Sequence, residues 1–448
     1  MKMKKAVPTG LTFVLAAGLL AACGGGNDNS GAPSSPDASP SGSSSASPSK
    51  SAEASPSQAA EELGGKLKVL THRTDLLNDG TLDRYAEKFK EKYPKAEIEY
   101  EAMTNYAQDI KVRLTTGEAG DVNMLDASLP NSELANYYEP LPDDLTRDMY
   151  FADLRAHEGK RYGLATGVNT QGIIYNKKAF AQAGIDKAPT TLDEFYAAAQ
   201  KLEDAGIIPL YMNYGAQWPI GSWAEGSVKY VAGDMLYFDQ FVTKDEVFTV
   251  DGPWGQLMSI ARKFVQEGWV EKDLATNNWE MSKGEVASGK AAMYFLGNWA
   301  IPQVIGAGAA SEDIGFFPLP YDNNGKLNAP LGPDYFIGVS KNSKNKELAF
   351  KYIEFFVKES GYVGSNGFMP VDKNAVPEVP QLAEFKSHNP NFLEEVAGDP
   401  KFNEIANKAE IDFFGGKYIQ ELIVAKDLQA AYDALNKKWA AARKVLGY

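Results

Sequence analysis

Tryptophans and polar side chains near predicted strand ends are the residues of this sequence whose types suit a carbohydrate. A sugar presents hydroxyl groups, which carboxylates, amides and guanidinium groups can bind, and a face of polarised C–H groups, which flat aromatic rings cover. Trp218 and Trp223 lie in an irregular loop after an extended run, and loops supply many ligand contacts. We predict that at least one faces a ligand, whereas Trp269 and Trp439 have the surroundings of core residues.

Polar candidates follow two of the predicted strands. Arg73 and Asp75 come after the apolar run 67–70, and Asp126 comes after the run 122–125. The carboxyl ends of strands in open α/β sheets border a crevice, so these side chains are predicted to bind ligand. Asp75 could instead be a loop or helix-capping carboxylate. If Arg73 faces the ligand, an anionic sugar becomes plausible, because a guanidinium group binds a carboxylate through two hydrogen bonds.

The composition argues against several other functions. The 448 residues include 45 basic and 59 acidic ones, for a formal charge of −14, whereas nucleic-acid binding needs a basic surface. With one cysteine and three histidines far apart, we expect no metal site, disulfide or cofactor. The common hydrolase, zinc-protease and nucleotide-binding motifs are absent from the sequence. We therefore expect no enzyme; a surface glycan-acting enzyme, which needs two suitably spaced carboxylates, is the less favoured alternative.

The N-terminal segment has the pattern of an export signal. Three lysines lie within the first five residues, and a short apolar run occupies residues 11–22, too short to span a bilayer as an ordinary helix. The following Leu-Ala-Ala-Cys sequence resembles the bacterial lipobox, whose cysteine, here Cys23, carries a lipid. Residues 1–22 are predicted to be a signal peptide, and the Ser-, Gly- and Pro-rich residues 23–65 a disordered tether.

The remaining chain alternates predicted strands and helices. Strand patterns at 67–70, 96–100 and 122–125 are separated by helical spacing of apolar residues, which predicts βαβ units and a largely parallel sheet. The pattern recurs in the second part of the chain, where Thr191 and Glu194 form a capping-box sequence before an amphipathic helix. Two α/β lobes are therefore predicted.

Several ordered sequence pieces resemble one protein family. Tyr-Asn-Lys-Lys-Ala-Phe at 175–180, Ala-Gly-Ile at 183–185 and Pro-Thr-Thr-Leu-Asp-Glu-Phe at 189–195 are similar to a signature of bacterial extracellular solute-binding proteins of family 1, which includes maltose-binding protein. Ala-Met-Tyr-Phe-Leu-Gly-Asn-Trp at 292–299 resembles a later motif of that family. One departure is Gly-Asp at 120–121, where the family usually has Pro-Asp.

The resemblance implies a periplasmic-binding-protein-like fold with an interlobe ligand cleft. It also implies that the protein acts as a monomer and passes a carbohydrate to the permease transmembrane subunits of an ABC importer. The lipobox implies attachment to the extracellular face of the membrane through Cys23. A non-sugar solute is the alternative ligand. Trp299 and Asn298 match the later motif, Asn169 lies in the first expected crossing between lobes, and Asp334 and Tyr335 lie at the second. The predicted parts are lobe 1 at 66–170 and 333–368, lobe 2 at 171–332 and 369–448, and crossings near 168–174, 331–337 and 367–372.

Overall fold

The computed structural model describes residues 63–103, 106–126, 129–411, 413 and 416–448. These residues all fall within one compact unit of the chain. Within these ranges, no helix is both long enough and apolar enough to cross a membrane. The predicted signal peptide, Cys23 and nearly all of the predicted tether lie outside the described residues.

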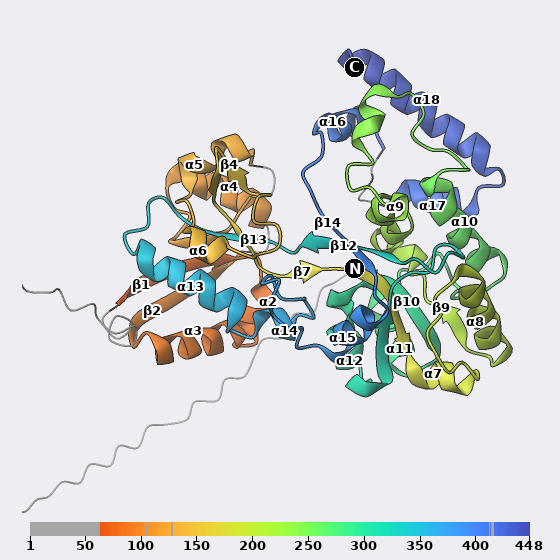
Figure 1. The fold of residues 1–448 in the computed structure, drawn as a ribbon, viewed down its shortest axis with the longest axis horizontal. Helices are drawn as coiled ribbons and strands as arrows, with labels where there is room; N and C mark the ends of the chain where they lie inside the picture. The colour runs from red at the N-terminus through yellow and green to blue at the C-terminus, as the bar shows by residue number, and fades with distance from the viewer. Residues whose placement is uncertain (1–62, 104–105, 127–128, 412, 414–415) are drawn as a thin grey trace, which may run out of the picture. The chain divides into compact units, whose positions relative to one another are not determined.

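A five-stranded sheet forms the first part of the fold (Figure 1). Its first three strands in space run parallel, and the other two neighbour pairs are antiparallel. In spatial order the strands are β2 (Lys95–Ala102), β1 (Gly64–Thr71), β3 (Val122–Met124), β13 (Phe336–Val339) and β6 (Leu164–Ala165). A strand from late in the chain thus lies between two early ones, so this part of the fold is built from two distant segments.

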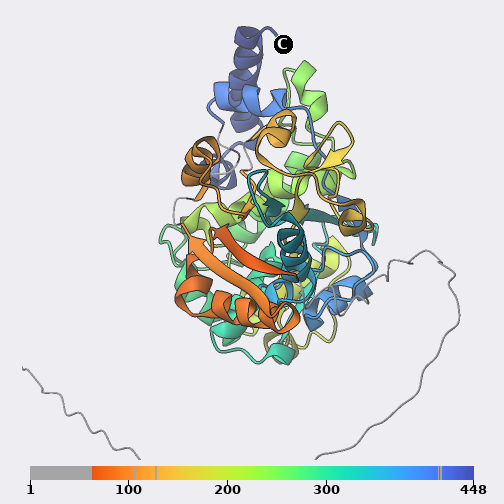
Figure 2. The ribbon, with the colours of Figure 1, turned by 90° about the vertical axis from the view of Figure 1, so that its left-hand side faces the viewer.

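The helices on this sheet follow the predicted spacing of apolar residues. Helix α3 (Thr81–Lys92) buries Leu82, Tyr85 and Phe89, which share one face. Helix α13 (Lys346–Lys358) contacts both α3 and β1. Figure 2 views this part with β1, β2 and α3, coloured orange to red, nearest the viewer.

A four-stranded sheet organises the second part. Strand β8 runs antiparallel to both neighbours, so the prediction of a largely parallel arrangement is wrong for this sheet. All residues of β10 are buried, with Tyr294 and Leu296 in one core and Met293 and Phe295 in another. Side chains alternate across a strand, so both faces of this sheet are covered. In spatial order the strands are β11 (Ile314–Phe317), β8 (Gln171–Asn176), β10 (Ala291–Gly297) and β9 (Ile208–Leu210).

Helices cover the second sheet. The capping-box helix forms as α8 (Leu192–Asp204), where Thr191 Oγ1 accepts a hydrogen bond from the Glu194 amide. The Glu194 carboxylate binds Thr190 rather than closing the box on Thr191.

The two parts of the fold contain further helices. The longer ones are α4 (Tyr106–Thr116), α9 (Glu225–Ala232), α10 (Pro253–Gln266), α11 (Trp279–Ala287), α15 (Pro380–Ser387), α16 (Lys401–Lys408), α17 (Lys417–Val424) and α18 (Leu428–Leu446). The shorter ones are α2 (Thr74–Asn78), α5 (Leu134–Tyr137), α6 (Asp143–Thr146), α7 (Lys177–Gln182), α12 (Ile301–Gly306) and α14 (Tyr362–Ser365).

Three segments of chain pass between the two sheets. The first contains β7 (Val168–Asn169), which pairs antiparallel with β12 (Asn328–Pro333) of the second. The third lies beside the first, because Val168 and Met369 form a bridge. Strand β14 (Asn391–Glu394) adds to the far side of β12.

A buried asparagine ties two of these crossings to the second sheet. Asn298, which directly follows β10, is 0% exposed. Its Oδ1 accepts from the Thr170 amide (2.7 Å), and its Nδ2 donates to the carbonyl oxygens of Val168 (3.3 Å) and Gly367 (2.6 Å). Burial and these bonds leave its amide nothing to offer a solute. The prediction of Asn298 as a ligand contact is therefore wrong, and its role is to join the crossings.

Replacing Asn298 by alanine is expected to destabilise the fold. The change leaves one buried N–H and two buried carbonyl groups without this partner, at a cost of about 2–3 kcal/mol in the free energy of unfolding. Denaturant unfolding followed by circular dichroism measures the loss. Asn407→Ala, on the exposed face of α16, is the matched control and should stay within about 0.5 kcal/mol of wild type. Equal stabilities for the two variants would contradict the assigned role.

Candidate functional site

Three tryptophans form an aromatic cluster at the end of the second sheet. Trp218 lies edge-on to Trp279, with ring centroids 4.9 Å apart, and Trp299 lies 5.6 Å from Trp218 and 6.1 Å from Trp279. Trp218 is 43% exposed, and the other two rings are half-buried. The cluster therefore unites Trp218 and Trp299, two predicted ligand residues, with Trp279, for which the sequence offered no distinguishing signal.

The parallel pairing of two strands explains why these rings meet. Strands β9 and β10 run parallel, so their carboxyl ends lie at the same edge of the sheet. Trp218 comes from the segment after β9, and Trp299 lies directly after Asn298 at the end of β10. The three hydrogen bonds of the Asn298 side chain thus also fix the backbone from which Trp299 projects.

Trp223 does not belong to this cluster. It is 1% exposed and packs edge-on against Phe295 (4.6 Å between centroids) and near Phe264 (6.3 Å). The short 3₁₀ segment Trp218–Trp223 therefore turns its first ring outward and its last ring into the core. Trp223, named as a ligand candidate, therefore has no surface to offer a ligand, and of the two loop tryptophans only Trp218 keeps an exposed face.

A buried carboxylate holds the turn that leads to Trp218. Glu271 is 6% exposed, and its two oxygens accept hydrogen bonds from the amides of Met212 (2.7 Å) and Tyr214 (3.2 Å). Burial raises the pKa of Glu271, although these backbone donors act in the opposite direction. The turn includes two non-glycine residues with positive φ, Asn213 (58°) and Gln217 (66°). Such strained backbone persists only where its surroundings hold it.

The outer side of the same turn is attached to α17. Tyr214 Oη donates to the Gln420 carbonyl oxygen (3.0 Å), and Gln420 Nε2 donates back to the Tyr214 carbonyl oxygen (2.6 Å). Gln217 Nε2 donates to Gln420 Oε1 (3.1 Å). Trp218 thus starts from a backbone that is fixed on both sides.

A polar network lies at the edge of the first sheet. Arg73 binds Asp75 through two hydrogen bonds, Nε to Oδ1 (2.9 Å) and Nη2 to Oδ2 (2.6 Å). Its Nη1 donates to Asn366 Oδ1 (2.6 Å) and lies 3.4 Å from Tyr362 Oη. Hydrogen bonding to Arg73 lowers the pKa of Asp75, so its carboxylate is ionised at neutral pH. Asn366 and Tyr362 were not predicted, because only the third crossing brings them here.

Asp334 joins this network from the second crossing. Its Oδ2 accepts from Thr166 Oγ1 (3.1 Å) and Tyr362 Oη (3.3 Å), and its amide donates to the Gly167 carbonyl oxygen. Burial raises the pKa of Asp334, and the hydroxyl donors oppose that effect. The predicted residues Arg73, Asp75 and Asp334 therefore come together although the sequence separates them widely.

Tyr335 supplies an aromatic face beside the same network. Its ring stacks on His72, with centroids 4.0 Å apart and an interplanar angle of 17°, and 36% of the residue is exposed. Burial lowers the pKa of His72 to about 4, so the supporting ring is uncharged at neutral pH. The arrangement presents a flat ring of the type that can cover a sugar face.

The two remaining predicted residues lie in different surroundings. Asp126 is only 6% exposed, and Arg155 donates to its backbone carbonyl oxygen (3.0 Å), which leaves little carboxylate surface for a ligand. Asn169, in the first crossing, is half-buried, and its Oδ1 accepts no hydrogen bond from the described residues. This oxygen atom is itself buried, so the structure does not expose it to a ligand.

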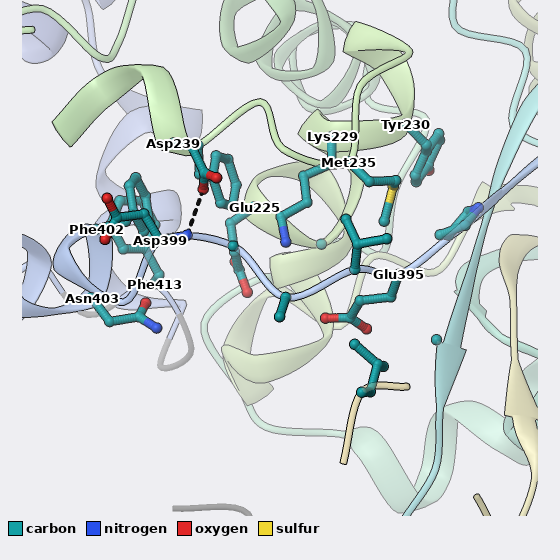
Figure 3. A pocket seen from close by; sticks show the side chains of 18 of the residues that line it. Glu225, Lys229, Tyr230, Met235, Asp239, Glu395, Asp399, Phe402, Asn403 and Phe413 are labelled. Atoms are coloured by element: carbon teal, nitrogen blue, oxygen red, sulfur yellow. Dashed lines mark hydrogen bonds between the residues drawn. The ribbon is translucent and has the colours of Figure 1, made fainter. Parts of the chain in front are cut away.

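A cavity of about 400 Å³ lies beside α9, β12 and the segment after β14 (Figure 3). Aromatic rings of Phe238, Phe402 and Phe413 line it with several charged side chains, but none of the predicted site residues does. Gln171 connects its wall to the first crossing by hydrogen bonds to Ser222 (2.6 Å) and Ser227 (3.0 Å). We place the candidate site at the tryptophan cluster and the polar network because exposed aromatic faces and polar groups meet the crossings there.

In the part of the chain that the structure describes, no group of His, Cys, Asp and Glu residues is arranged to hold a metal ion. Two α/β sheets joined by three crossings, with aromatic and polar groups beside those crossings, define a two-lobed binding protein. The model of the bacterial extracellular solute-binding protein family matches residues 74–362, more than half of the chain. The chain belongs to this family.

Two relatives agree with this assignment over part of their length. An ABC transporter extracellular-binding protein of Pyrococcus horikoshii is 25% identical over 53% of this chain and 57% of the relative. The diacetylchitobiose-binding protein of Streptomyces coelicolor is 28% identical over 48% of this chain and 50% of the relative. The chain thus spans about half the length of these relatives.

Solved structures match over more of the chain. A manno-oligosaccharide-specific solute-binding protein of Bifidobacterium animalis subsp. lactis, in complex with mannotriose, is 26% identical, with a TM-score of 0.71, over 88% of this chain and 98% of that protein. RafE of Streptococcus pneumoniae, 17% identical with a TM-score of 0.69 over 85% and 98% of the two chains, shares the fold. The predicted two-lobe solute-binding fold is confirmed.

Replacing Glu271 by glutamine is expected to displace Trp218. A glutamine oxygen can accept from one of the two amides, but its NH₂ group opposes the other, which costs about 1–3 kcal/mol for a buried unpaired donor. The close edge-on pair of Trp218 and Trp279 should give an exciton couplet in far-ultraviolet circular dichroism, and the variant should weaken it. Trp279→Phe identifies the contribution of the Trp218–Trp279 pair, because it leaves only the Trp218–Trp299 pair of the cluster (5.6 Å between centroids).

Glu267→Gln is the matched control for this experiment, because Glu267 forms only an exposed pair with Lys263. It should keep the full couplet. A Glu271→Gln spectrum that coincides with wild type would show that the buried carboxylate does not position Trp218.

Proposed function

We propose that this protein captures a carbohydrate, most simply an oligosaccharide, and delivers it to the transmembrane subunits of an ABC importer. The observation that carries the proposal is the cluster of Trp218, Trp279 and Trp299 directly beside the crossings that Asn298 joins. Aromatic faces bind the C–H side of sugar rings, and polar groups such as the exposed carboxylate of Asp75 can bind hydroxyl groups.

The similar proteins support the ligand class. The relatives and structures above include proteins described as binding diacetylchitobiose and manno-oligosaccharides. Two lobes joined by short crossings can close on a solute, and the ligand favours the closed form by binding it more tightly. A closed, loaded form that the permease recognises would complete the delivery step.

The remaining features follow from the sequence and the family. We propose that the protein acts as a monomer and a binding protein rather than an enzyme. Cys23 would carry the lipid that holds the protein at the extracellular face of the membrane, and residues 23–65 would act as a flexible tether. The extracellular setting itself is a property of the family.

A calorimetric screen tests the proposed ligand class. Mannobiose, mannotriose, raffinose, diacetylchitobiose and xylo-oligosaccharides form the neutral set, with amino acids, polyamines and glycerophosphodiesters as the non-sugar set. Micromolar or tighter binding of at least one oligosaccharide is expected. Binding confined to the non-sugar set would replace the carbohydrate by another solute within the same fold, and turnover of any glycan would reveal an enzyme.

Replacing Trp299 by alanine is expected to weaken binding of the sugar found in this screen by about 30-fold, or about 2 kcal/mol, the usual size for a central aromatic contact. Titration calorimetry measures the affinity, and thermal unfolding checks that the fold persists. Tyr448→Ala, at the exposed C-terminal end, controls for loss of an aromatic side chain. An unchanged affinity would place the sugar elsewhere, for example in the cavity beside α9.

Replacing Cys23 by serine in the full-length precursor is expected to prevent lipid attachment, since the acyl group needs the thiol. The protein should move from the membrane fraction to the soluble exported fraction of a bacterial host, as measured by fractionation and immunoblotting. Two acyl chains anchor a protein stably. A variant that stays in the membrane fraction to the wild-type extent would exclude Cys23 as the anchor.

A further inference from the structure

We infer that the sugar site favours ligands without a carboxylate. The reason is that Asp75 already pairs with Arg73, the cation that a uronate would need. This inference rests on the proposed function and adds the charge class of the ligand. The sequence left open whether Arg73 faces the ligand and, if it does, whether it binds an anionic sugar. The partners of the guanidinium group argue against an anionic sugar.

Arg73 has its hydrogen-bonding capacity largely filled within the protein. Asp75 takes the two parallel donors Nε and Nη2, which form the edge that a ligand carboxylate would otherwise bind. Asn366 and Tyr362 take Nη1. The Arg73 side chain is 18% exposed, whereas that of Asp75 is 63% exposed, so the group that an approaching ligand meets is the carboxylate.

Other charged groups near the two clusters also have partners within the protein. Arg155, beside Asp126, donates from Nη2 to the carbonyl oxygens of Asp126 and Leu129 (3.0 Å each). Asp334 lies in the network of Arg73, where Tyr362 contacts both it and Arg73. At the tryptophan cluster, Lys283 lies 4.8 Å from the centre of the Trp279 ring and pairs with Glu280 (2.9 Å). Arg73 and Lys283 thus each have a carboxylate partner among the described residues.

Among the described residues that line the cavity beside α9, acidic groups outnumber basic ones, as they do in the network of Arg73, Asp75 and Asp334. Lys229 is the only basic residue of this described lining, and its ammonium lies 5.0 Å from the centre of the Phe238 ring. The carboxylates in the same described lining, labelled in Figure 3, are Glu225, Asp239, Glu395 and Asp399. A ligand carboxylate in this cavity would meet excess negative charge from the described lining residues.

A ligand carboxylate would therefore be repelled or would have to displace Asp75. Like charges a few ångströms apart repel each other at a protein surface, and the repulsion is screened by salt. Hydroxyl groups face no such cost, because ionised carboxylates accept their hydrogen bonds. The expected result is discrimination of at least about tenfold between a neutral sugar and its uronate.

The test compares one oligosaccharide in two charge states. Titration calorimetry measures the dissociation constant of the tightest neutral oligosaccharide of the screen and of the same oligosaccharide with a terminal C6 hydroxymethyl group oxidised to carboxylate. At 20 mM ionic strength the uronate should bind at least tenfold more weakly, and the gap should narrow in 300 mM salt, because salt screens exposed charges. Equal affinities, or tighter binding of the uronate, would overturn the inference.

Asp75→Asn tests the residue assigned to this discrimination. The variant removes the carboxylate that covers Arg73, so the ratio of uronate to neutral dissociation constants should fall by at least fivefold, whatever happens to either affinity alone. Asp75→Ser gives a second variant with the same expectation. Asp79→Asn is the matched control, since Asp79 is exposed near the end of the same helix and caps Thr81 instead of binding Arg73; its ratio should match wild type.

The outcomes separate this inference from the proposed function. If neither neutral nor acidic sugars bind, the carbohydrate proposal fails and this inference fails with it. If sugars bind but the uronate binds as well as its neutral form, only the inference fails. If the ratio in Asp75→Asn equals that of wild type, Asp75 does not set the charge preference and the assignment is wrong.

Discussion

The buried amide of Asn298 is the interaction on which the functional arrangement depends. It satisfies backbone groups of the first and third crossings from the end of β10. Buried backbone groups are costly when unpaired, so this single side chain fixes where the crossings meet the second sheet. Trp299 follows it directly in the chain, and Asn169 lies between two residues that it binds. Connection of the lobes and placement of the binding groups therefore share one local structure.

The two sheets contribute different chemistry to the candidate site. The second sheet provides indole rings, which come from the ends of the parallel pair β9 and β10. The first sheet provides Arg73 and Asp75 after β1 and the Tyr335 ring supported by His72. A sugar has an apolar face and a polar rim, so it needs both kinds of contact. A site divided in this way favours closure of the lobes on the ligand, because only a closed form can bring aromatic and polar contacts to the same sugar.

The outcome for individual residues shows where sequence reasoning succeeds. The order of the elements and the helices were predictable because apolar spacing reports burial directly, as in α3 and α8. Trp218 and Trp223 illustrate the limit: they lie in one short segment, and a sequence pattern does not tell which of them turns outward. Asn298 shows a second limit, since its partners lie far away in the chain. Glu271, Asn366 and Tyr362 carried no local signal, because their importance arises from contacts with distant segments.

By itself, the sequence determined the α/β class, the acidic character, the family resemblance, and the predicted export signal with Cys23. These properties depend on composition or on patterns within short windows, which local physical chemistry can interpret. The tertiary structure decided that three tryptophans meet and that the second sheet is mixed. It also decided that Asn298 joins two crossings by hydrogen bonds and that Asp75 covers Arg73. Each of these depends on long-range contacts: a side chain becomes a ligand contact or a structural one according to which distant groups satisfy its hydrogen bonds and cover its surface.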